Sequence, residues 1–196
     1  LGVNGFFDKG INWSNYQLGD IAQFINGLGF KSSEWLKEGI PIVRIQNLTD
    51  DKKEFNYTHA NHPSDRMIDS GDLLIAWSGT IDVYKWERGS AAVNQHIYKV
   101  ILNEKVILPD FMFILQKVVL KDLLGSSHMR GTTMKHLKKA SITKYSVQIP
   151  SLEEQERIVA RVDELMELCD QLEDKLSSQV ELADEYVTAA AHALVS

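Results

Sequence analysis

The sequence predicts an α+β fold: a mixed, mostly antiparallel sheet domain with short helices over residues 1–150, followed by one long C-terminal coiled-coil helix over 151–196. Two features of the sequence predict it. Short apolar segments separated by turns rich in Gly, Asn and Ser occupy most of the first 150 residues, as is typical of strands. From Ser151 onward, apolar residues recur every three or four positions with no Pro or Gly, which indicates one unbroken helix.

The elements of the first domain follow in chain order. Strands are expected where apolar and β-branched residues alternate or run together. These segments are 18–24, 40–48, 73–77, 82–88, 91–102 and 142–149. Pro109 suits the first turn of a helix and Gly125 suits its end, so a helix is predicted from 109 to about 124. A short helical turn over 33–37 and a short basic helix over 134–140 complete the expected elements.

The long helix has the pattern of a coiled-coil seam. Ser151 and Glu154 have the spacing of a capping box at its first turn. Apolar positions then alternate between steps of three and four, about 3.5 residues on average, which is the period of a seam packed on another helix. The predicted interface residues are Ile158, Val162, Leu165, Cys169, Leu172, Leu176, Gln179, Ala183, Tyr186 and Ala190. Part of the helix is expected to project and pair; the alternative is a helix folded back on its own domain.

Composition and charge limit the class of protein. The single cysteine, Cys169, cannot form an internal disulfide, and no apolar run approaches the ~18 residues of a membrane span. A cytoplasmic protein without a membrane partner is therefore expected. The net charge of −6 is unevenly distributed: residues 151–196 carry 12 acidic and 3 basic side chains, whereas residues 1–150 carry 15 acidic and 18 basic ones. An acidic helix joined to a mildly basic domain predicts two surfaces with different partners.

Positive charge is concentrated between Lys117 and Lys144, where seven basic residues accompany only Asp122. Such a patch favours polyanions, most commonly nucleic acid, although a solvated lysine face would look the same. The candidate phosphate contacts are Arg130, Thr132, Thr133, Lys135, Lys138 and Lys139. A helix cap is the alternative role of the two threonines.

Side chains with paired donors and acceptors are candidates for reading bases. They are Arg44, Gln46, Asn47, Asn94, Gln95 and His96. The structural alternative for the amide residues is to close a strand or a turn. Lys85 and Arg88 are further candidates because they flank Trp86, for which a place in the core is the alternative.

The sequence lacks the motifs of several catalytic classes. It has no Gly-x-Gly-x-x-Gly, no Walker A loop, and no Asn/Asp-Pro-Pro-aromatic loop of the kind that methylates exocyclic amines, because its four prolines are isolated. His59 and His62 lie near Asp65, but the segment is typical of a polar loop, and no histidine has a zinc-ligand spacing with Cys169. We therefore expect no catalysis, metal or cofactor in this chain; a stand-alone methyltransferase or nuclease is the alternative.

Several segments, taken together, carry a family resemblance. The most specific is 147–159, which reads Val-Gln-Ile-Pro-Ser-Leu-Glu-Glu-Gln-Glu-Arg-Ile-Val, and it follows Gly-Thr-Thr-Met-Lys-His-Leu at 131–137. Weaker pieces precede them in order: 18–21, 39–48, 71–75, 79–81 and 94–96. In this order they resemble the specificity (S) subunit of type I restriction–modification systems, over nearly the whole chain. Since members of that family read different DNA sequences, the resemblance implies a structural or backbone-contacting role as the alternative for candidates inside these shared pieces. It places the choice of sequence in the segments outside them, 84–88 and 52–62.

The resemblance implies a target recognition domain that reads one half of a split site in double-stranded DNA, and a helix that pairs and sets the distance between the halves. It implies a methyltransferase (M) subunit docked on the helices and a restriction (R) subunit, with S-adenosylmethionine and ATP bound by those partners. The usual S subunit has two domain-plus-helix halves and this chain has one. It is therefore expected to be a half-size subunit that forms a homodimer, or a fragment of a full subunit. The alternative function is a non-enzymatic coiled-coil adaptor that binds only protein.

Overall fold

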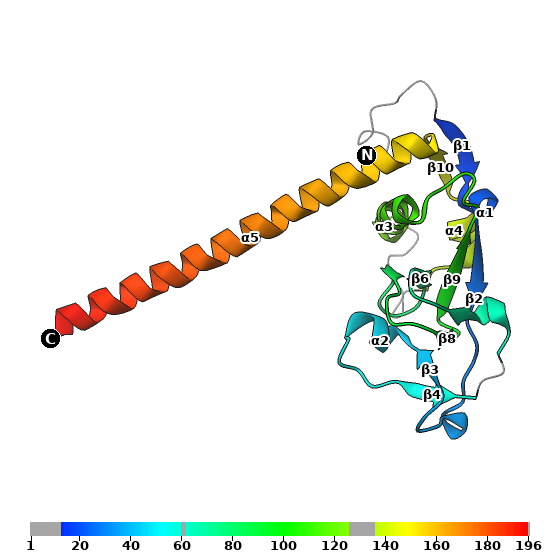
Figure 1. The fold of residues 1–196 in the computed structure, drawn as a ribbon, viewed down its shortest axis with the longest axis horizontal. Helices are drawn as coiled ribbons and strands as arrows, with labels where there is room; N and C mark the ends of the chain where they lie inside the picture. The colour runs from blue at the N-terminus through cyan, green and yellow to red at the C-terminus, as the bar shows by residue number, and fades with distance from the viewer. Residues whose placement is uncertain (1–12, 60–61, 126–135, 196) are drawn as a thin grey trace. The chain divides into compact units, whose positions relative to one another are not determined.

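A computed structural model describes residues 13–59, 62–125 and 136–195 of the chain (Figure 1). The chain divides into two units, Leu1–Gln155 and Glu156–Ser196, each described here on its own. Together they contain short strands, short helices and one long C-terminal helix, which confirms the predicted α+β class. No helix in the described ranges is both long enough and apolar enough to span a membrane.

Three sheets form the strand framework of the first unit in the part that the structure describes. One has the order β2 (Ala22–Asn26), β9 (Ile97–Leu102), β6 (Leu73–Ala76), β7 (Asp82–Lys85). The second has the order β4 (Asn56–Thr58), β3 (Ile40–Val43), β8 (Ala91–Val93), β5 (Met67–Ile68). β1 (Ser14–Gln17) pairs with β10 (Ser146–Ile149). Only β3 and β8 pair in parallel among these strands, so the sheets are mixed and mostly antiparallel, as predicted.

The helices of the first unit are short except for α3. They are α1 (Leu18–Ile21), α2 (Ile45–Thr49), α3 (Pro109–Gly125) and α4 (Lys139–Thr143), with single turns at Ser32–Glu34 and Ser64–Arg66. α3 packs against β7. Its buried face includes Phe111, Met112 and Val119. The predicted helix at 109–124 is confirmed.

The two four-stranded sheets share one core. Val43, Ile68 and Val93 come from one sheet, and Leu74 and Ile97 come from the other. Trp86 is also buried in this cluster, so the core alternative holds for that residue. Because both sheets contribute to the same core, the turn that carries the chain from β8 to β9 lies where they meet (Figure 1).

Several predicted strands are shorter than expected because polar side chains accept hydrogen bonds from nearby backbone N–H groups and turn the chain. Asp20 accepts from the backbone N–H of Gln17 at 2.9 Å, and residues 18–21 form α1, so the strand predicted at 18–24 begins only at Ala22, as β2. Asn47 accepts from the backbone N–H of Arg44 at 3.1 Å, so the strand predicted at 40–48 ends at Val43 and α2 begins. In the same way the 91–102 segment is two strands, because residues 94–96 form a turn.

The remaining differences concern boundaries. The strand predicted at 82–88 ends at Lys85, and the strand predicted at 142–149 begins at Ser146 because α4 continues to Thr143. The basic helix predicted at 134–140 is α4, displaced toward the C-terminus. β1, β4 and β5 were not predicted, since each is at most four residues long and carries no clear alternation.

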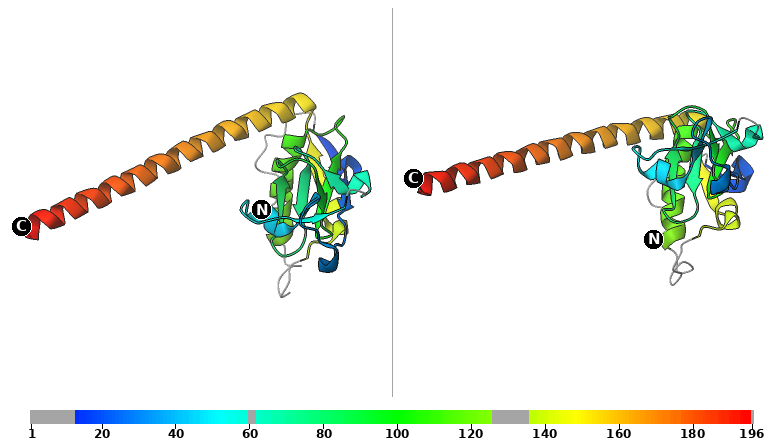
Figure 2. Two further views of the ribbon diagram at one scale, coloured as in Figure 1. Left: turned by 60° about the horizontal axis from the view of Figure 1, so that its bottom comes forward. Right: turned by 90° about the horizontal axis from the view of Figure 1, so that it is seen from below.

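The long helix α5 runs from Leu152 to Val195 without a break (Figure 2). At about 1.5 Å per residue, its 44 residues span roughly 66 Å. Gln155 fixes its first turn, because this fully buried side chain accepts from Leu108 N at 2.9 Å and donates to Val106 O at 2.8 Å and Pro150 O at 3.0 Å. Such a satisfied buried amide holds the start of α5 on the loop before α3.

Candidate nucleic-acid interface

The turn Asn94-Gln95-His96 is held rigidly at the place where the two large sheets meet. Asn94 N donates to Val43 O at 3.0 Å, and Gln95 N donates to Leu28 O at 2.7 Å. Leu28 N in turn donates to Val93 O at 2.7 Å. A Cβ on Gly27 would lie 2.2 Å from the carbonyl oxygens of both Val93 and Asn94, so only glycine allows this close approach.

Trp77 joins this turn to two other segments. Its indole Nε1 donates to Gln95 O at 3.2 Å, and its backbone carbonyl accepts from Leu137 N at 2.9 Å. The Trp77 ring centroid lies 5.2 Å from that of His96 and 5.9 Å from that of His136. It also stacks on Tyr98 with the ring centroids 5.9 Å apart, and burial raises the pKa of this tyrosine above its usual value.

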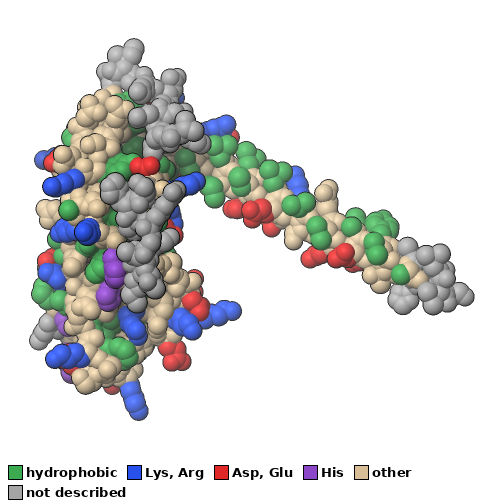
Figure 3. Space-filling view, turned by 180° about the vertical axis from the view of Figure 1, so that it is seen from behind, with side chains coloured by type: hydrophobic (Ala, Val, Ile, Leu, Met, Phe, Trp, Pro, Cys, Tyr) green, Lys and Arg blue, Asp and Glu red, His purple; other side chains and the backbone are tan. Residues whose placement is uncertain are grey.

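We call the surface formed by residues 77–80, 94–98 and 136–139 the junction surface. None of these three segments contains an Asp or Glu, in a chain whose net charge is −6. Gln95, His136, Lys138 and Lys139 are exposed on it. Figure 3 shows histidine side chains among Lys and Arg side chains on one face of this unit. Exposed basic and polar side chains on segments that meet at a half-buried tryptophan and carry no carboxylate are typical of a surface that binds nucleic acid.

The junction surface contains five of the predicted site residues: Asn94, Gln95, His96, Lys138 and Lys139. The side chain of Asn94 is turned toward the chain itself, where it accepts from His96 N at 3.3 Å. The structure adds Trp77 and His136, which were not among them. The only sequence signals for these two were an aromatic residue directly after a buried strand and a histidine inside the basic stretch. Arg130, Thr132, Thr133 and Lys135 lie outside the described residues.

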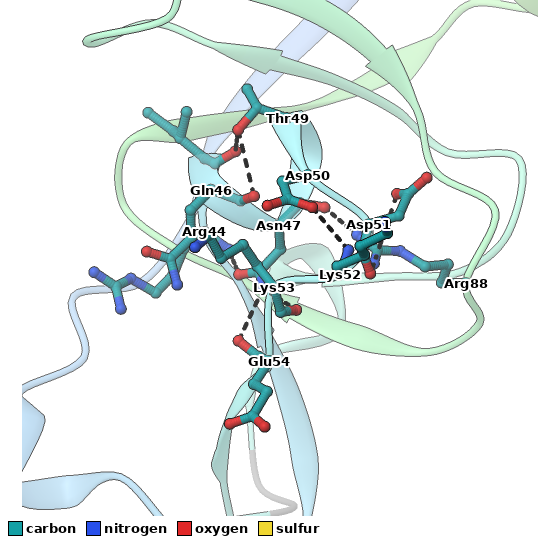
Figure 4. Close-up of polar contacts among 11 residues, drawn as sticks. Arg44, Gln46, Asn47, Thr49, Asp50, Asp51, Lys52, Lys53, Glu54 and Arg88 are labelled. Carbon is teal, nitrogen blue, oxygen red and sulfur yellow. Dashed lines mark hydrogen bonds and ion pairs between the residues drawn. The ribbon is translucent and has the colours of Figure 1, made fainter.

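Arg44, Gln46 and Asn47 form a second group of candidates, at the end of β3 (Figure 4). The Arg44 guanidinium lies 5.0 Å from the Trp35 ring centroid and donates to Asn56 Oδ1 at 3.1 Å. Gln46 is exposed. Both side chains are therefore placed where they can contact a ligand, Arg44 in a fixed and half-buried position.

Asn47 is the one base-reading candidate that the structure opposes. Its side chain is 0% exposed. The amide accepts from Arg44 N and donates to Lys53 O and Glu54 O, each at 3.1 Å. Because both the oxygen and the amino group of this side chain are hydrogen-bonded inside the chain, Asn47 cannot reach a base edge. Asn47 therefore has a structural role, which was the alternative given for it from the sequence.

Lys85 and Arg88 are engaged within the chain. Lys85 Nζ forms an ion pair with Asp110 at 3.0 Å. The Arg88 guanidinium donates to Asn47 O, and its Cζ lies 4.8 Å from the ring centroid of Trp86 and 4.9 Å from that of Phe55. Figure 4 shows Arg44 and Arg88 on opposite sides of Asn47. The contacts of Arg88 fix the 47–51 segment to the core, whereas the Lys85 pair is exposed and of little energetic weight.

The second unit presents an apolar row along α5 (Figure 3). Leu172 is 65% exposed and Tyr186 69% exposed, and Leu165 and Leu176 are exposed as well. Cys169, Gln179 and Ala183 are exposed, whereas Ile158 and Val162 are half-buried. The side chain of Ala190 lies outside the described residues. A helix with a row of large apolar side chains exposed to water is stabilised when it pairs with another helix, because pairing buries that apolar surface.

The described residues contain no group of three or more His, Cys, Asp or Glu side chains arranged to hold a metal ion. His62 is engaged differently: its Nε2 lies 3.0 Å from Thr58 Oγ1 and its ring packs edge-on against Phe30.

Comparison with known proteins gives a consistent result. The family model described as "Type I restriction modification DNA specificity domain" matches residues 10–182. The chain is 23% identical to the type I restriction enzyme EcoBI specificity subunit of Escherichia coli, over 99% of the chain and 41% of that protein. It is 21% identical to the MjaVIII specificity subunit of Methanocaldococcus jannaschii, over 89% of the chain and 40% of that protein. The chain thus spans about two fifths of the length of these relatives.

Solved structures show the same fold. The HsdS subunit from Thermoanaerobacter tengcongensis matches with a TM-score of 0.66 and 17% identity, over 84% of this chain and 40% of that one. A chain from a study of complex assembly in the type I R-M system matches with a TM-score of 0.69 and 18% identity, over 86% of this chain and 42% of that one.

Proposed function

Because the chain belongs to the family of type I restriction modification DNA specificity domains, we propose that it is the DNA-recognition component of a type I restriction–modification complex. The first unit is the target recognition domain and reads one half-site of a bipartite target. The alternative of an adaptor that binds only protein is not favoured, since the matching family is defined by DNA specificity.

The junction surface is the observation that supports DNA binding best. His136 and Gln95 meet at Trp77, whose ring centroid lies 5.9 Å from that of His136 and whose indole donates to Gln95 O. Lys138 and Lys139 follow His136 in the chain and are exposed, and none of the three segments contains a carboxylate. Lysines that neutralise phosphates provide affinity, and polar side chains on a rigid turn can reach base edges. The surface combines both kinds of contact.

The chain acts in a complex and performs no chemistry itself. The M subunit binds S-adenosylmethionine and the R subunit binds ATP, whereas this chain recognises the DNA target. The match to about two fifths of each specificity-subunit relative supports one recognition half in the sequence given. We propose that α5 pairs through its apolar row with the α5 of a second copy or with the equivalent helix of a second half.

The test uses the chain purified with its methyltransferase subunit. Methylation mapping of the host genome identifies the target, and fluorescence anisotropy measures the affinity of a target duplex at several salt concentrations. Lys138→Glu and Lys139→Glu should each weaken binding. Each should also make the negative slope of log affinity against log salt shallower by about 1.

Lys105→Glu is the matched control, because this exposed lysine lies beyond the opposite end of β9 from the junction surface. Unchanged affinity and slope in both junction variants would refute the junction surface as the DNA-binding face. An effect of equal size in the control would show that only net charge matters.

A further inference from the structure

Gln95 has a fixed backbone and an exposed side chain. Its N–H donates to Leu28 O at 2.7 Å, and its carbonyl accepts from the Trp77 indole at 3.2 Å. Leu28 lies two residues after β2 and Trp77 directly after β6, so both partners are anchored by strands of the same sheet. The backbone of Gln95 therefore cannot move without breaking two hydrogen bonds. Only the side chain is left to respond to a ligand.

The side-chain amide is also confined. Its Nε2 lies 3.4 Å from His96 Nε2. Its Oε1 lies 3.0 Å from the place that a Cβ on Gly29 would occupy. His96 is itself held against Trp77, and its other ring nitrogen is buried without a hydrogen-bond partner. The amide therefore lies between a ring that orients it and a glycine that leaves room for it.

The confined amide keeps its hydrogen-bonding capacity. A glutamine amide has two N–H donors and an acceptor oxygen, and His96 is the one side chain within hydrogen-bond distance of it in the described part of the chain. Whichever way the amide is turned, one N–H and one lone pair stay available. The major-groove edge of adenine offers the complementary pair, N7 as acceptor and N6 as donor.

We propose that Gln95 reads an adenine in the DNA half-site through the major groove, and that Gly29 and His96 are positioning residues for its amide. This inference rests on the proposed function and adds the base class that the junction surface recognises. An exposed glutamine that is hydrogen-bonded only to water would need neither the contact with the His96 ring nor the space left by the absence of a side chain at Gly29.

The experiment replaces each adenine of the mapped target in turn by 7-deazaadenine, which lacks the N7 acceptor. Affinities are measured by anisotropy for the complex with the methyltransferase subunit. At one adenine the natural protein should lose about fivefold in affinity, the value of a single hydrogen bond. Gln95→Ala should lose about 5- to 100-fold on the natural duplex and be insensitive to replacement of that adenine.

Gln23→Ala is the matched control, since Gln23 is an exposed glutamine on β2. Gly29→Ala should lower the affinity for the natural duplex and also reduce the 7-deazaadenine effect. It should leave the unfolding temperature unchanged, because the new methyl group meets no backbone atom and only the exposed side chain of Gln95, which it would displace toward solvent. Gly125→Ala, with no atom within 4 Å of the added Cβ, controls for a glycine substitution.

Two results would overturn the adenine contact. In the first, Gln95→Ala weakens target and scrambled duplexes equally, as loss of a phosphate contact would. In the second, natural protein and Gln95→Ala respond alike to every replaced adenine. If either occurs while Lys139→Glu still weakens binding, the proposed function stands and this inference alone fails.

Discussion

Replacing Asn47 with alanine should destabilise the fold, although Asn47 has the side-chain chemistry of a base reader. The substitution removes three hydrogen bonds of 3.1 Å from a fully buried site and leaves the partner groups on Arg44, Lys53 and Glu54 without them. At about 1 kcal/mol for each, the free energy of unfolding should fall by about 3 kcal/mol. For a chain of this size, the unfolding temperature should fall by about 6–12 °C.

Urea unfolding followed by circular dichroism measures this change. Gln46→Ala is the matched control: it is the preceding residue and exposed, and it should alter the free energy of unfolding by less than about 0.5 kcal/mol. Asn47→Asp keeps the acceptor for Arg44 N but directs a carboxylate at two carbonyl oxygens, so it should destabilise at least as much. Equal stability of Asn47→Ala and Gln46→Ala would refute a structural role for the amide.

Three further predictions concern the helix, the alkaline stability and the junction turn. Leu172→Asp should convert a self-associated chain to monomer in sedimentation velocity, because it places a charge in the apolar row; Gln171→Asp, beside the row, should not. Burial and the hydrogen bond to Asp122 at 2.6 Å raise the pKa of Tyr145 to about 12. The contribution of Tyr145 to the free energy of unfolding is therefore present below pH 10 and lost as the pH rises toward 12. Tyr145→Phe should lose less stability over that range than the natural protein. An equal loss in both would show that other groups cause the decline. Gly27→Ala should lower the unfolding temperature strongly, since its Cβ would overlap two carbonyl oxygens, and an unchanged temperature would show that the turn can shift.

The elements that the sequence predicted well are those whose pattern is long or continuous. α5 has a seam of several heptads, α3 begins at Pro109 and ends at Gly125, and β6 is an unbroken apolar run. α1 and the end of β3 were predicted wrongly because one side chain in each, Asp20 or Asn47, accepts from a nearby backbone N–H and turns the chain. Such a bond depends on the local conformation and leaves no period in the sequence.

The candidate site was predictable in its chemistry but not in its assembly. Gln95, His96, Lys138 and Lys139 were identified by residue type, and the structure places them on one surface. The part played by Trp77 and His136 depends on tertiary contact between segments that are far apart in the chain. For Arg88, the pattern of alternating aromatic and basic residues did not reveal that its guanidinium binds Asn47 O and packs between two rings.

The most direct test of the account is the ratio of affinities of the chain, in complex with its methyltransferase subunit, for the mapped target duplex and for a scrambled duplex of equal length at ~150 mM salt. A DNA-specificity component should prefer its target by at least about a thousandfold. Equal affinities for the two duplexes would contradict the assignment of this chain as the part of the complex that selects the DNA site.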